Sequence, residues 1–300
     1  MPDSHLPTVA VVGSQGQLGA ELMRQLNGRV ISLGREQLDI TRPRDVLETL
    51  TRLAPAVVWN AAAYTAVDRA ETERDACYAV NARGVEHLAA ACRRLDCLLV
   101  QISTDYVFGA DRSRSTPYRE DDSPGPQSVY AQSKLAGELA AATCPRHFIV
   151  RTCGLYGRRI ESAQRNFVDT MLALAADRPA VRVVHDQRCT PSYVPEVARA
   201  VRLLAGTTAY GTYHVTNAGA ASWQEFAEEI FRQAGLATLV EPITSAQFGA
   251  AAPRPAYSVL DNGKFHALAS SGLSPLPHWR DSLRDYLAGI GRLAGDSGGN

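Results

Sequence analysis

The sequence predicts an α/β fold of the Rossmann type, a doubly wound parallel sheet with a smaller carboxyl-terminal lobe that binds substrate. Two observations lead to this prediction. Up to about residue 155, short runs of β-branched apolar residues alternate with segments of helical spacing, which is the pattern of βαβ units. A glycine-rich turn also follows the first of these runs directly, as it does in dinucleotide-binding sheets.

The composition indicates a folded chain whose partner is a small molecule. The 300 residues are 45% hydrophobic and their formal net charge is zero. Such a chain can build a full core, and it lacks the basic run that nucleic acid or an anionic membrane would need. We predict a cofactor-binding domain over residues 1–155, a mainly substrate-binding lobe over 156–292 that can return a strand to the sheet, and a flexible tail over 293–300.

The amino-terminal residues and the cysteines lead us to expect a cytoplasmic chain. Residues 1–7 are polar, and the apolar run 9–12 ends at Gly13, well short of a signal-peptide core or a membrane span. The 6 cysteines form no Cys-x-x-Cys pair and have no histidine nearby at zinc spacing. We therefore expect reduced, mostly buried thiols and no structural zinc.

The first turn has the composition of a phosphate-binding loop. Glycines spaced Gly-x-x-Gly-x-x-Gly separate the strand-like residues 8–13 from residues 20–26, which have helical spacing. Glycines let the backbone turn tightly and approach a pyrophosphate, which then meets the free amides and positive dipole of the helix start. Any βα turn can use glycine, but its place after the first strand favours a dinucleotide. The predicted contacts are Gly13, Gln15, Gly16, Gln17, Leu18 and Gly19.

The residues after the second predicted strand bear on the choice of cofactor. An acidic residue about 20 positions after the glycine turn binds the ribose 2′-hydroxyl of NAD, whereas an arginine suits the 2′-phosphate of NADP. Arg35 favours NADPH, and the adjacent Glu36 leaves NADH open. Asp39 and Ile40 are further cofactor candidates, with Asp39 facing the adenine amino group. Alternatively, Asp39 caps the helix that Pro43 begins.

Small side chains follow the third predicted strand, residues 56–59. They allow a flat cofactor to lie close to the backbone, although a small-residue turn packed against a helix has the same composition. The cofactor contacts predicted here are Ala61, Ala62, Ala63 and Thr65. Residues 71–95 then read as one long helix.

The strongest chemical signal is a tyrosine and a lysine four residues apart, Tyr130 and Lys134. Of 31 basic side chains only Lys134 and Lys264 are lysines, so a Tyr-x-x-x-Lys pair is expected by chance only roughly 0.07 times. On a helix both side chains face the same way. A surface tyrosine stacked on a lysine stem gives the same spacing. The fourth predicted strand, residues 98–102, ends just before a candidate hydroxyl in Ser103-Thr104-Asp105.

Beyond residue 157 the pattern becomes less regular and suits a smaller lobe. Ser222 with Glu225 three residues later has the form of a capping box. Helices are predicted at residues 166–176, 194–204, 223–233 and 279–290, and strands at 181–184 and 211–215.

The glycine turn, the hydroxyl after the fourth strand and the Tyr-x-x-x-Lys pair, in this order, resemble the extended short-chain dehydrogenase/reductase superfamily. Four longer stretches are similar to the dTDP-4-dehydrorhamnose reductase family, and they span nearly the whole chain. They are Asn60-Ala-Ala-Ala-Tyr-Thr-Ala-Val-Asp68, Ser103-Thr-Asp-Tyr-Val-Phe108, Asp186-Gln-Arg-Cys-Thr-Pro-Ser-Tyr-Val-Pro195 and Arg254-Pro-Ala-Tyr-Ser-Val-Leu-Asp-Asn262. The resemblance implies reduction of the 4-keto group of dTDP-4-dehydro-6-deoxy-L-mannose by a nicotinamide hydride, giving dTDP-L-rhamnose.

The resemblance also implies roles for individual residues. Tyr130 would be the proton donor, Lys134 would bind the nicotinamide ribose and support the tyrosine, and Thr104 would hydrogen-bond the substrate oxygen. Elementary chemistry agrees, because hydride addition develops negative charge on oxygen and a nearby ammonium favours a tyrosine anion. The predicted substrate contacts are Thr104, Asp105, Tyr130, Asn166 and Tyr193.

Two departures from the family leave specificity and assembly open. Gly154 stands where well-studied members place a tryptophan against the reacting sugar, so we expect Tyr156 or Tyr193 to line the pocket instead. Some members dimerise through a magnesium ion held by glutamates, and no group of carboxylates in this sequence maps onto that site. Metal dependence therefore stays open, as does the choice between monomer and homodimer.

One main alternative lies within the same superfamily, and two further functions fit the sequence less well. A reductase or epimerase acting on another 4-keto sugar nucleotide would carry the same motifs. A dehydratase would have a glutamate where Tyr106 stands. A non-catalytic regulatory subunit would not need Tyr130, Lys134 and Thr104 intact.

Overall fold

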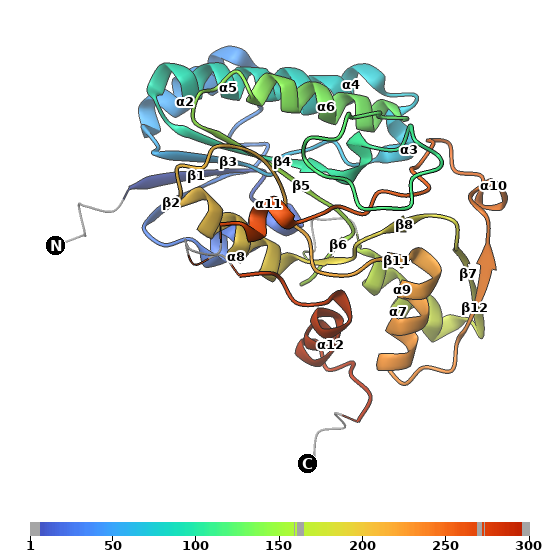
Figure 1. Cartoon of the computed structure of the whole chain (residues 1–300). Coiled ribbons are helices and arrows are strands. Elements are labelled where there is room, and N and C mark those ends of the chain that lie inside the picture. The colour runs from blue at the N-terminus through green and yellow to red at the C-terminus, as the bar shows by residue number, and fades with distance from the viewer. Residues whose placement is uncertain (1–6, 159, 161–164, 269–271, 273, 296–300) are drawn as a thin grey trace.

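A six-stranded parallel sheet forms the centre of the computed structural model (Figure 1), which describes residues 7–158, 160, 165–268, 272 and 274–295. The strands lie in the order β10-β5-β4-β3-β1-β2, and every neighbouring pair is parallel. Their bounds are β1 Thr8–Val12, β2 Arg29–Leu33, β3 Val57–Asn60, β4 Leu98–Thr104, β5 His147–Thr152 and β10 Gly211–His214. The predicted fold class is confirmed.

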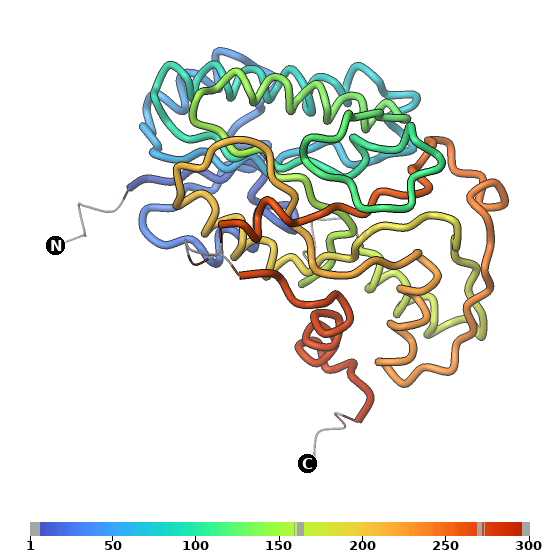
Figure 2. The backbone as a smooth tube through the Cα atoms, viewed as in Figure 1, coloured from blue at the N-terminus to red at the C-terminus, as the bar shows by residue number. Residues whose placement is uncertain are grey.

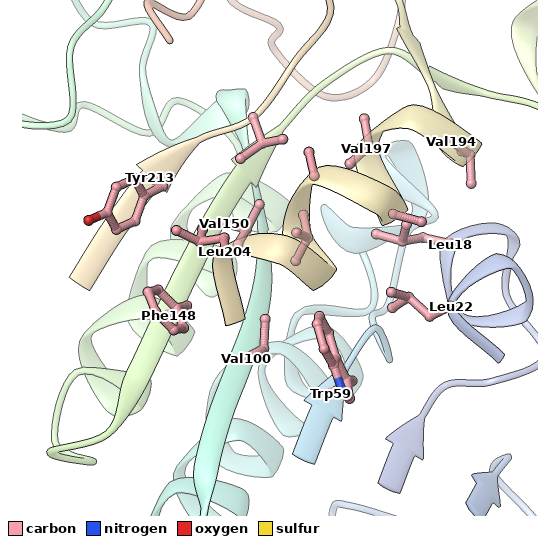
Figure 3. Close-up of a cluster of buried hydrophobic side chains, with 14 of the residues drawn as sticks. Leu18, Leu22, Trp59, Val100, Phe148, Val150, Val194, Val197, Leu204 and Tyr213 are labelled. Atoms are coloured by element: carbon pink, nitrogen blue, oxygen red, sulfur yellow. The ribbon is translucent and has the colours of Figure 1, made fainter. Parts of the chain in front are cut away.

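Helices cover both faces of this sheet, as βαβ connections require (Figure 1). The longest helices on the upper face in the figure are α2 Pro43–Leu53, α5 Gly84–Leu95 and α6 Val129–Ala141, and on the opposite face α1 Gln17–Gln25 packs against α8 Val194–Ala205. Figure 3 shows the apolar core between the sheet and α8, where Leu204 lies near Val150 and Val197 lies on the side towards Leu18. A second apolar cluster fills the space under α2 and α5.

The prediction of one regular helix over residues 71–95 is wrong. The helical path begins only at α4 Arg74–Tyr78 and passes through a π-helical turn, η1 Ala79–Arg83, before α5. The wide turn carries Asn81, whose side chain bonds the backbone of Tyr64 and the hydroxyl of Ser133. Single π-turns of this kind are frequent near functional sites. These contacts join residues far apart in sequence, so helical spacing alone did not reveal them.

The second half of the chain builds the lobe and also supplies β10 to the sheet edge beside β5. The lobe has three longer helices, α7 Phe167–Asp177, α9 Trp223–Gln233 and α12 Trp279–Gly289. The capping box of Ser222 and Glu225 is confirmed at the start of α9. The division at residue 155 stays a prediction, and part of the predicted tail, residues 296–300, lies outside the described residues.

Short elements complete the fold. Three two-stranded pairs are β7 Ala180–Val184 with β12 Leu239–Ile243, β8 Arg188–Cys189 with β11 Ala221–Ser222, and β6 Leu155–Tyr156 with β9 Ser192–Tyr193. The short helices are α3 Val67–Ala70, η2 Asp105–Val107, α10 Ser245–Phe248 and α11 Gly263–His266. Within the described residues, no helix is long and apolar enough to cross a bilayer.

One irregular segment ties the lobe to the sheet. Residues 251–262, here named the crossing segment, run between α10 and α11 and can be followed in orange in Figure 2. The backbone of Ser258 donates to Arg188 in the lobe, while Tyr118 donates to Val259 and accepts from Asp261. The crossing segment therefore contacts both the lobe and the loop that follows β4.

Candidate active site

The glycine turn after β1 is built for close backbone approach. Gly13 has φ +73°, and a Cβ there would collide with the backbone of Ala61 and Ala62 at the end of β3. Only glycine meets both demands. The N-cap of α1 is Gly16, which offers no side chain to the first-turn amides. These amides and the helix dipole suit a pyrophosphate, so the turn fits a dinucleotide.

The other predicted cofactor residues surround this turn. Arg35 is exposed just beyond β2, and the pKa of Asp39 is lowered mainly by a hydrogen bond from Thr41, with the charge of Arg35 adding to the effect. Asp39 accepts hydrogen bonds from the amide and hydroxyl of Thr41, so the alternative that it caps the Pro43 helix is wrong; the N-cap is Arg42. Ile40 is buried.

The small residues after β3 lie directly beside the glycine turn. The amide of Ala61 donates to the carbonyl of Val12, and the amide of Ala62 donates to the side-chain oxygen of Asn60. Ala63 is half-buried and Thr65 is exposed. The structure thus brings the predicted cofactor residues of β1, β2 and β3 to one edge of the sheet, where ligands of such folds bind.

Thr104 and Tyr130 meet at the carboxyl end of β4. Ser128 caps α6 and thereby sets the start of the helix that carries Tyr130. The Thr104 hydroxyl lies close enough to the Tyr130 phenol to affect its pKa. Burial raises the pKa of Tyr130 above its usual range, and the Thr104 hydroxyl acts in the opposite direction. A phenol that keeps its proton until charge develops on a bound oxygen is suited to act as a general acid.

Asp105 lies next to this pair with its carboxyl buried. It accepts hydrogen bonds from the hydroxyls of Thr104, at 3.1 Å, and of Ser258, at 2.5 Å. Burial raises the pKa of Asp105 to about 7, with these two bonds opposing the shift. The ring of Tyr106 packs edge-on against Tyr130 with centroids 6.0 Å apart. A buried carboxyl therefore helps to orient the hydroxyl that contacts Tyr130.

Lys134 faces the same strand one helical turn further along. Its Nζ donates a 2.6 Å hydrogen bond to the carbonyl of Ile102, and burial lowers the pKa of Lys134 to about 8. The support that Lys134 would give to a Tyr130 anion remains a prediction.

Asn166 and Tyr193, the two lobe residues predicted to bind substrate, contact neighbouring residues of the protein. Asn166 caps α7, where its side chain donates to the Gly157 carbonyl and to the Asp169 carboxylate. Gln17 also donates to the Gly157 carbonyl, so Asn166 lies near the phosphate-binding turn. Tyr193 is half-buried and stacks on Tyr156 with ring centroids 5.6 Å apart.

The expectation that Tyr156 lines the pocket is wrong. Its side chain is fully buried in the apolar cluster of the lobe, and its hydroxyl donates to the Trp279 carbonyl. Gly154 itself has φ +55°, and a Cβ there would meet the Thr190 oxygen and the Pro191 Cα at 3.1 Å. The chain around Gly154 thus leaves no room for a larger side chain unless residues 190–191 move.

The sequence motifs did not reveal Asn81 or Ser258 as parts of the site. Asn81 lay in a predicted plain helix, and Ser258 lay in a stretch quoted only for its resemblance. Both act through contacts between distant segments. Among the described residues, no group of three histidine, cysteine or acidic side chains is placed to hold a metal ion.

A parallel sheet with a dinucleotide-type glycine turn, and a Thr-Tyr-Lys set at the end of the fourth strand, define an extended short-chain dehydrogenase/reductase. The model of the RmlD substrate binding domain family matches residues 7–291. The chain belongs to this family, and it is similar to the dTDP-4-dehydrorhamnose reductase of Streptomyces griseus. That protein is 42% identical over 300 residues, covering 96% of each chain.

Other relatives agree with this family assignment. The spore coat polysaccharide biosynthesis protein SpsK of Bacillus subtilis is 41% identical, covering 93% of this chain and 96% of that protein. A crystal structure of the dTDP-4-dehydrorhamnose reductase of Bacillus anthracis in complex with NADP has a TM-score of 0.88 and 38% identity, covering 94% of this chain and 99% of that one. The predicted family and the predicted oxidoreductase class are confirmed.

Proposed function

We propose that this protein reduces the 4-keto group of dTDP-4-dehydro-6-deoxy-L-mannose with NADPH and releases dTDP-L-rhamnose. The position of the Tyr130 phenol beside Thr104, at the end of β4, is the observation that carries the proposal. It supports a proton donor and a second hydroxyl at the edge of the sheet where the glycine turn lies. The names of the family members give the substrate class.

The residues of the site supply what ketone reduction requires. A hydride added to the carbonyl carbon leaves negative charge on oxygen, which takes up one proton to become the alcohol. Tyr130 donates that proton, and the Thr104 hydroxyl contacts the same oxygen. Lys134 holds the ribose beside the nicotinamide. Asp105 contacts the sugar and orients Thr104.

NADPH, when bound, supplies the hydride. The residues present fit it, because Gly13 and Gly16 leave the start of α1 open to a pyrophosphate. Arg35 is the cation for the 2′-phosphate. The NADP complex of the Bacillus anthracis relative supports the choice of NADPH over NADH. A cytoplasmic location and a monomeric or homodimeric state remain predictions, as does any role of magnesium.

A second candidate is the reduction of a different dTDP-linked 4-keto sugar. Gly154 favours this alternative, since the wall expected from a tryptophan is absent at that position and the Thr190–Pro191 backbone occupies the adjoining space. One relative, 41% identical with 93% of this chain covered, is named a probable dTDP-4,6-dihydroxy-2-methyloxan-3-one 4-ketoreductase of Streptomyces antibioticus.

The proposal is tested by following the oxidation of NADPH and of NADH with enzymatically generated dTDP-4-dehydrorhamnose and with a second dTDP-4-keto sugar. We expect the highest kcat/KM with NADPH and dTDP-4-dehydrorhamnose, and dTDP-L-rhamnose as the product. A higher kcat/KM with the second sugar would establish the alternative. Turnover of neither sugar with either cofactor would contradict both.

A further inference from the structure

A buried ion pair, Glu138 with Arg151, lies beside the candidate active site. Neither residue has a role in the proposed reaction. The side chains of Glu138 and Arg151 are only 5% and 6% exposed, and their closest atoms are 2.7 Å apart. Arg151 also donates through Nε to both Glu138 oxygens. Burying two charges costs about as much free energy as their attraction returns, so stability alone is a weak reason for such a pair.

Glu138 and Lys134 both form hydrogen bonds to β4, just before its carboxyl end. The Lys134 ammonium donates to the Ile102 carbonyl, and the hydroxyl of the next residue, Ser103, donates to Glu138 at 2.5 Å. Lys134 and Glu138 are four residues apart on α6 and so share one face of the helix. Two successive contacts therefore hold α6 against β4 immediately before Thr104.

The surroundings of Lys134 contain one carboxylate that favours its charged form. From α4, the Cys77 thiol faces it, and burial raises the pKa of that thiol, so it is neutral. From β4, the contact is the uncharged Ile102 carbonyl. From α6 itself, Glu138 raises the pKa of Lys134 and opposes the larger effect of burial, which brings it to about 8.

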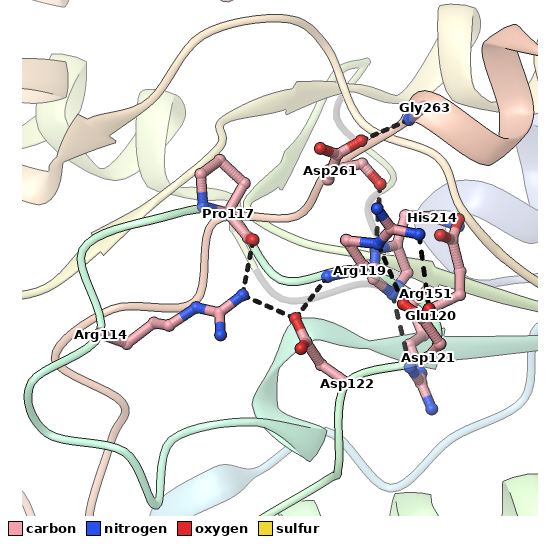
Figure 4. Close-up of polar contacts among 10 residues, drawn as sticks. All are labelled: Arg114, Pro117, Arg119, Glu120, Asp121, Asp122, Arg151, His214, Asp261 and Gly263. Atoms are coloured by element: carbon pink, nitrogen blue, oxygen red, sulfur yellow. Dashed lines mark hydrogen bonds and ion pairs between the residues drawn. The ribbon is translucent and has the colours of Figure 1, made fainter.

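The far side of the ion pair faces the imidazole of His214. Arg151 extends from Glu138 towards His214, with 3.4 Å between its Nη1 and the imidazole Nε2, and Figure 4 shows these two side chains together near Glu120. Burial, followed by the charge of Arg151, lowers the pKa of His214 to about 3, so the imidazole is neutral. Glu120 accepts from the backbone amide of His214. The guanidinium of Arg151 thus has Glu138 as its bonded carboxylate.

We propose that Glu138 is a positioning residue of the active site, the counter-charge that keeps the buried Lys134 in its ammonium form. Arg151 and Ser103 hold the Glu138 carboxylate in place for this purpose. The consequence for turnover rests on the proposed function, but the protonation of Lys134 is a property of the protein alone. The two can therefore be tested separately.

The direct test uses the fact that the chain has only two lysines, Lys134 and Lys264. Protein labelled with ¹³C-lysine gives two Cε signals by NMR, which Lys264→Arg assigns. We expect the Lys134 signal of the unaltered protein to titrate near pH 8, and its midpoint in Glu138→Gln to fall by about one pH unit or more. The matched control is Glu229→Gln, which removes a carboxylate paired with Arg232 on α9. It should leave the midpoint unchanged.

The kinetic counterpart is the pH dependence of kcat/KM with NADPH. The ammonium is lost as the pH rises through the pKa of Lys134, so the decline at high pH should move to lower pH by the same amount in Glu138→Gln and not in Glu229→Gln. An unmoved Lys134 midpoint in folded Glu138→Gln would overturn the proposal. If that variant does not fold, Glu138→Gln with Arg151→Met removes both buried charges, and a midpoint equal to that of the unaltered protein would overturn it equally. A shifted midpoint with no change in kinetics would contradict only the role proposed for Lys134.

Discussion

The hydroxyl of Ser258 donates a 2.5 Å hydrogen bond to the Asp105 carboxylate across 153 positions of sequence. The contact joins the crossing segment to the end of β4. The other Asp105 oxygen accepts from Thr104, which lies beside Tyr130. A residue of the second half of the chain therefore helps to set the geometry around Thr104 and Tyr130.

Replacing Ser258 with alanine should weaken both the fold and the site. Loss of a donor to a buried carboxyl typically costs about 1–3 kcal/mol, which urea-induced unfolding would measure. The pKa of Asp105 should rise further, because the Ser258 bond lowers it. The control is Ser245→Ala, which removes a 2.7 Å bond to Asp186 between lobe residues. A loss of kcat/KM as large in Ser245→Ala as in Ser258→Ala would contradict a specific role for Ser258.

Asp105 should make the stability of the protein depend on pH. Its pKa is about 7 in the folded chain and 3.8 as the reference value, so between these pH values the folded state holds the proton more tightly. Its stabilising contribution is full below pH 3.8 and is lost as the pH rises through about 7.

The variant Asp105→Asn cannot titrate at this position. Relative to it, the free energy of unfolding of the unaltered protein should fall by about 4 kcal/mol as the pH rises from about 4 to about 8. Urea titrations of both proteins over this range measure the difference, and the opposite effect of neutral His214 cancels because both proteins contain it. A difference independent of pH would show that the Asp105 carboxyl is not held protonated.

Gly13→Ala should impair dinucleotide binding and destabilise the fold. The new Cβ would collide with the backbone of Ala61 and Ala62, in addition to the strain of a positive φ. Strain of this kind costs about 1–3 kcal/mol, and the collision adds to it. Gly249→Ala is the matched control, since Gly249 has φ +66° but nothing lies within 4 Å of its Cβ position. Equal losses of NADPH affinity and of Tm in the two variants would contradict the close approach at Gly13.

Local patterns in the sequence were sufficient for the glycine turn, the capping box of Ser222 and the helix that carries Tyr130 and Lys134. Each of these depends on residues within one turn or one helix. β12 was missed because its sequence, Leu239–Ile243, contains a proline and mostly exposed side chains. A short edge strand of this kind lacks the apolar alternation on which strand prediction depends.

Contacts between distant segments were beyond the reach of the sequence pattern. Tyr156 was expected in the pocket, but the packing of the lobe turns its ring into the core, and nothing adjacent in sequence specifies that direction. The same is true of Asn81, whose partners Tyr64 and Ser133 lie on other elements. Elements and contacts that depend on neighbouring residues were thus easier to predict than contacts between distant segments.

The most direct test of the account is the turnover of Tyr130→Phe with NADPH and dTDP-4-dehydrorhamnose. The substitution removes the hydroxyl that donates the proton and keeps the ring that packs against Tyr106. We expect kcat to fall by about 10²–10⁴-fold, as for the loss of a general acid, while the Kd of NADPH stays nearly unchanged. A kcat equal to that of the unaltered protein would contradict the assignment of Tyr130 as the proton donor.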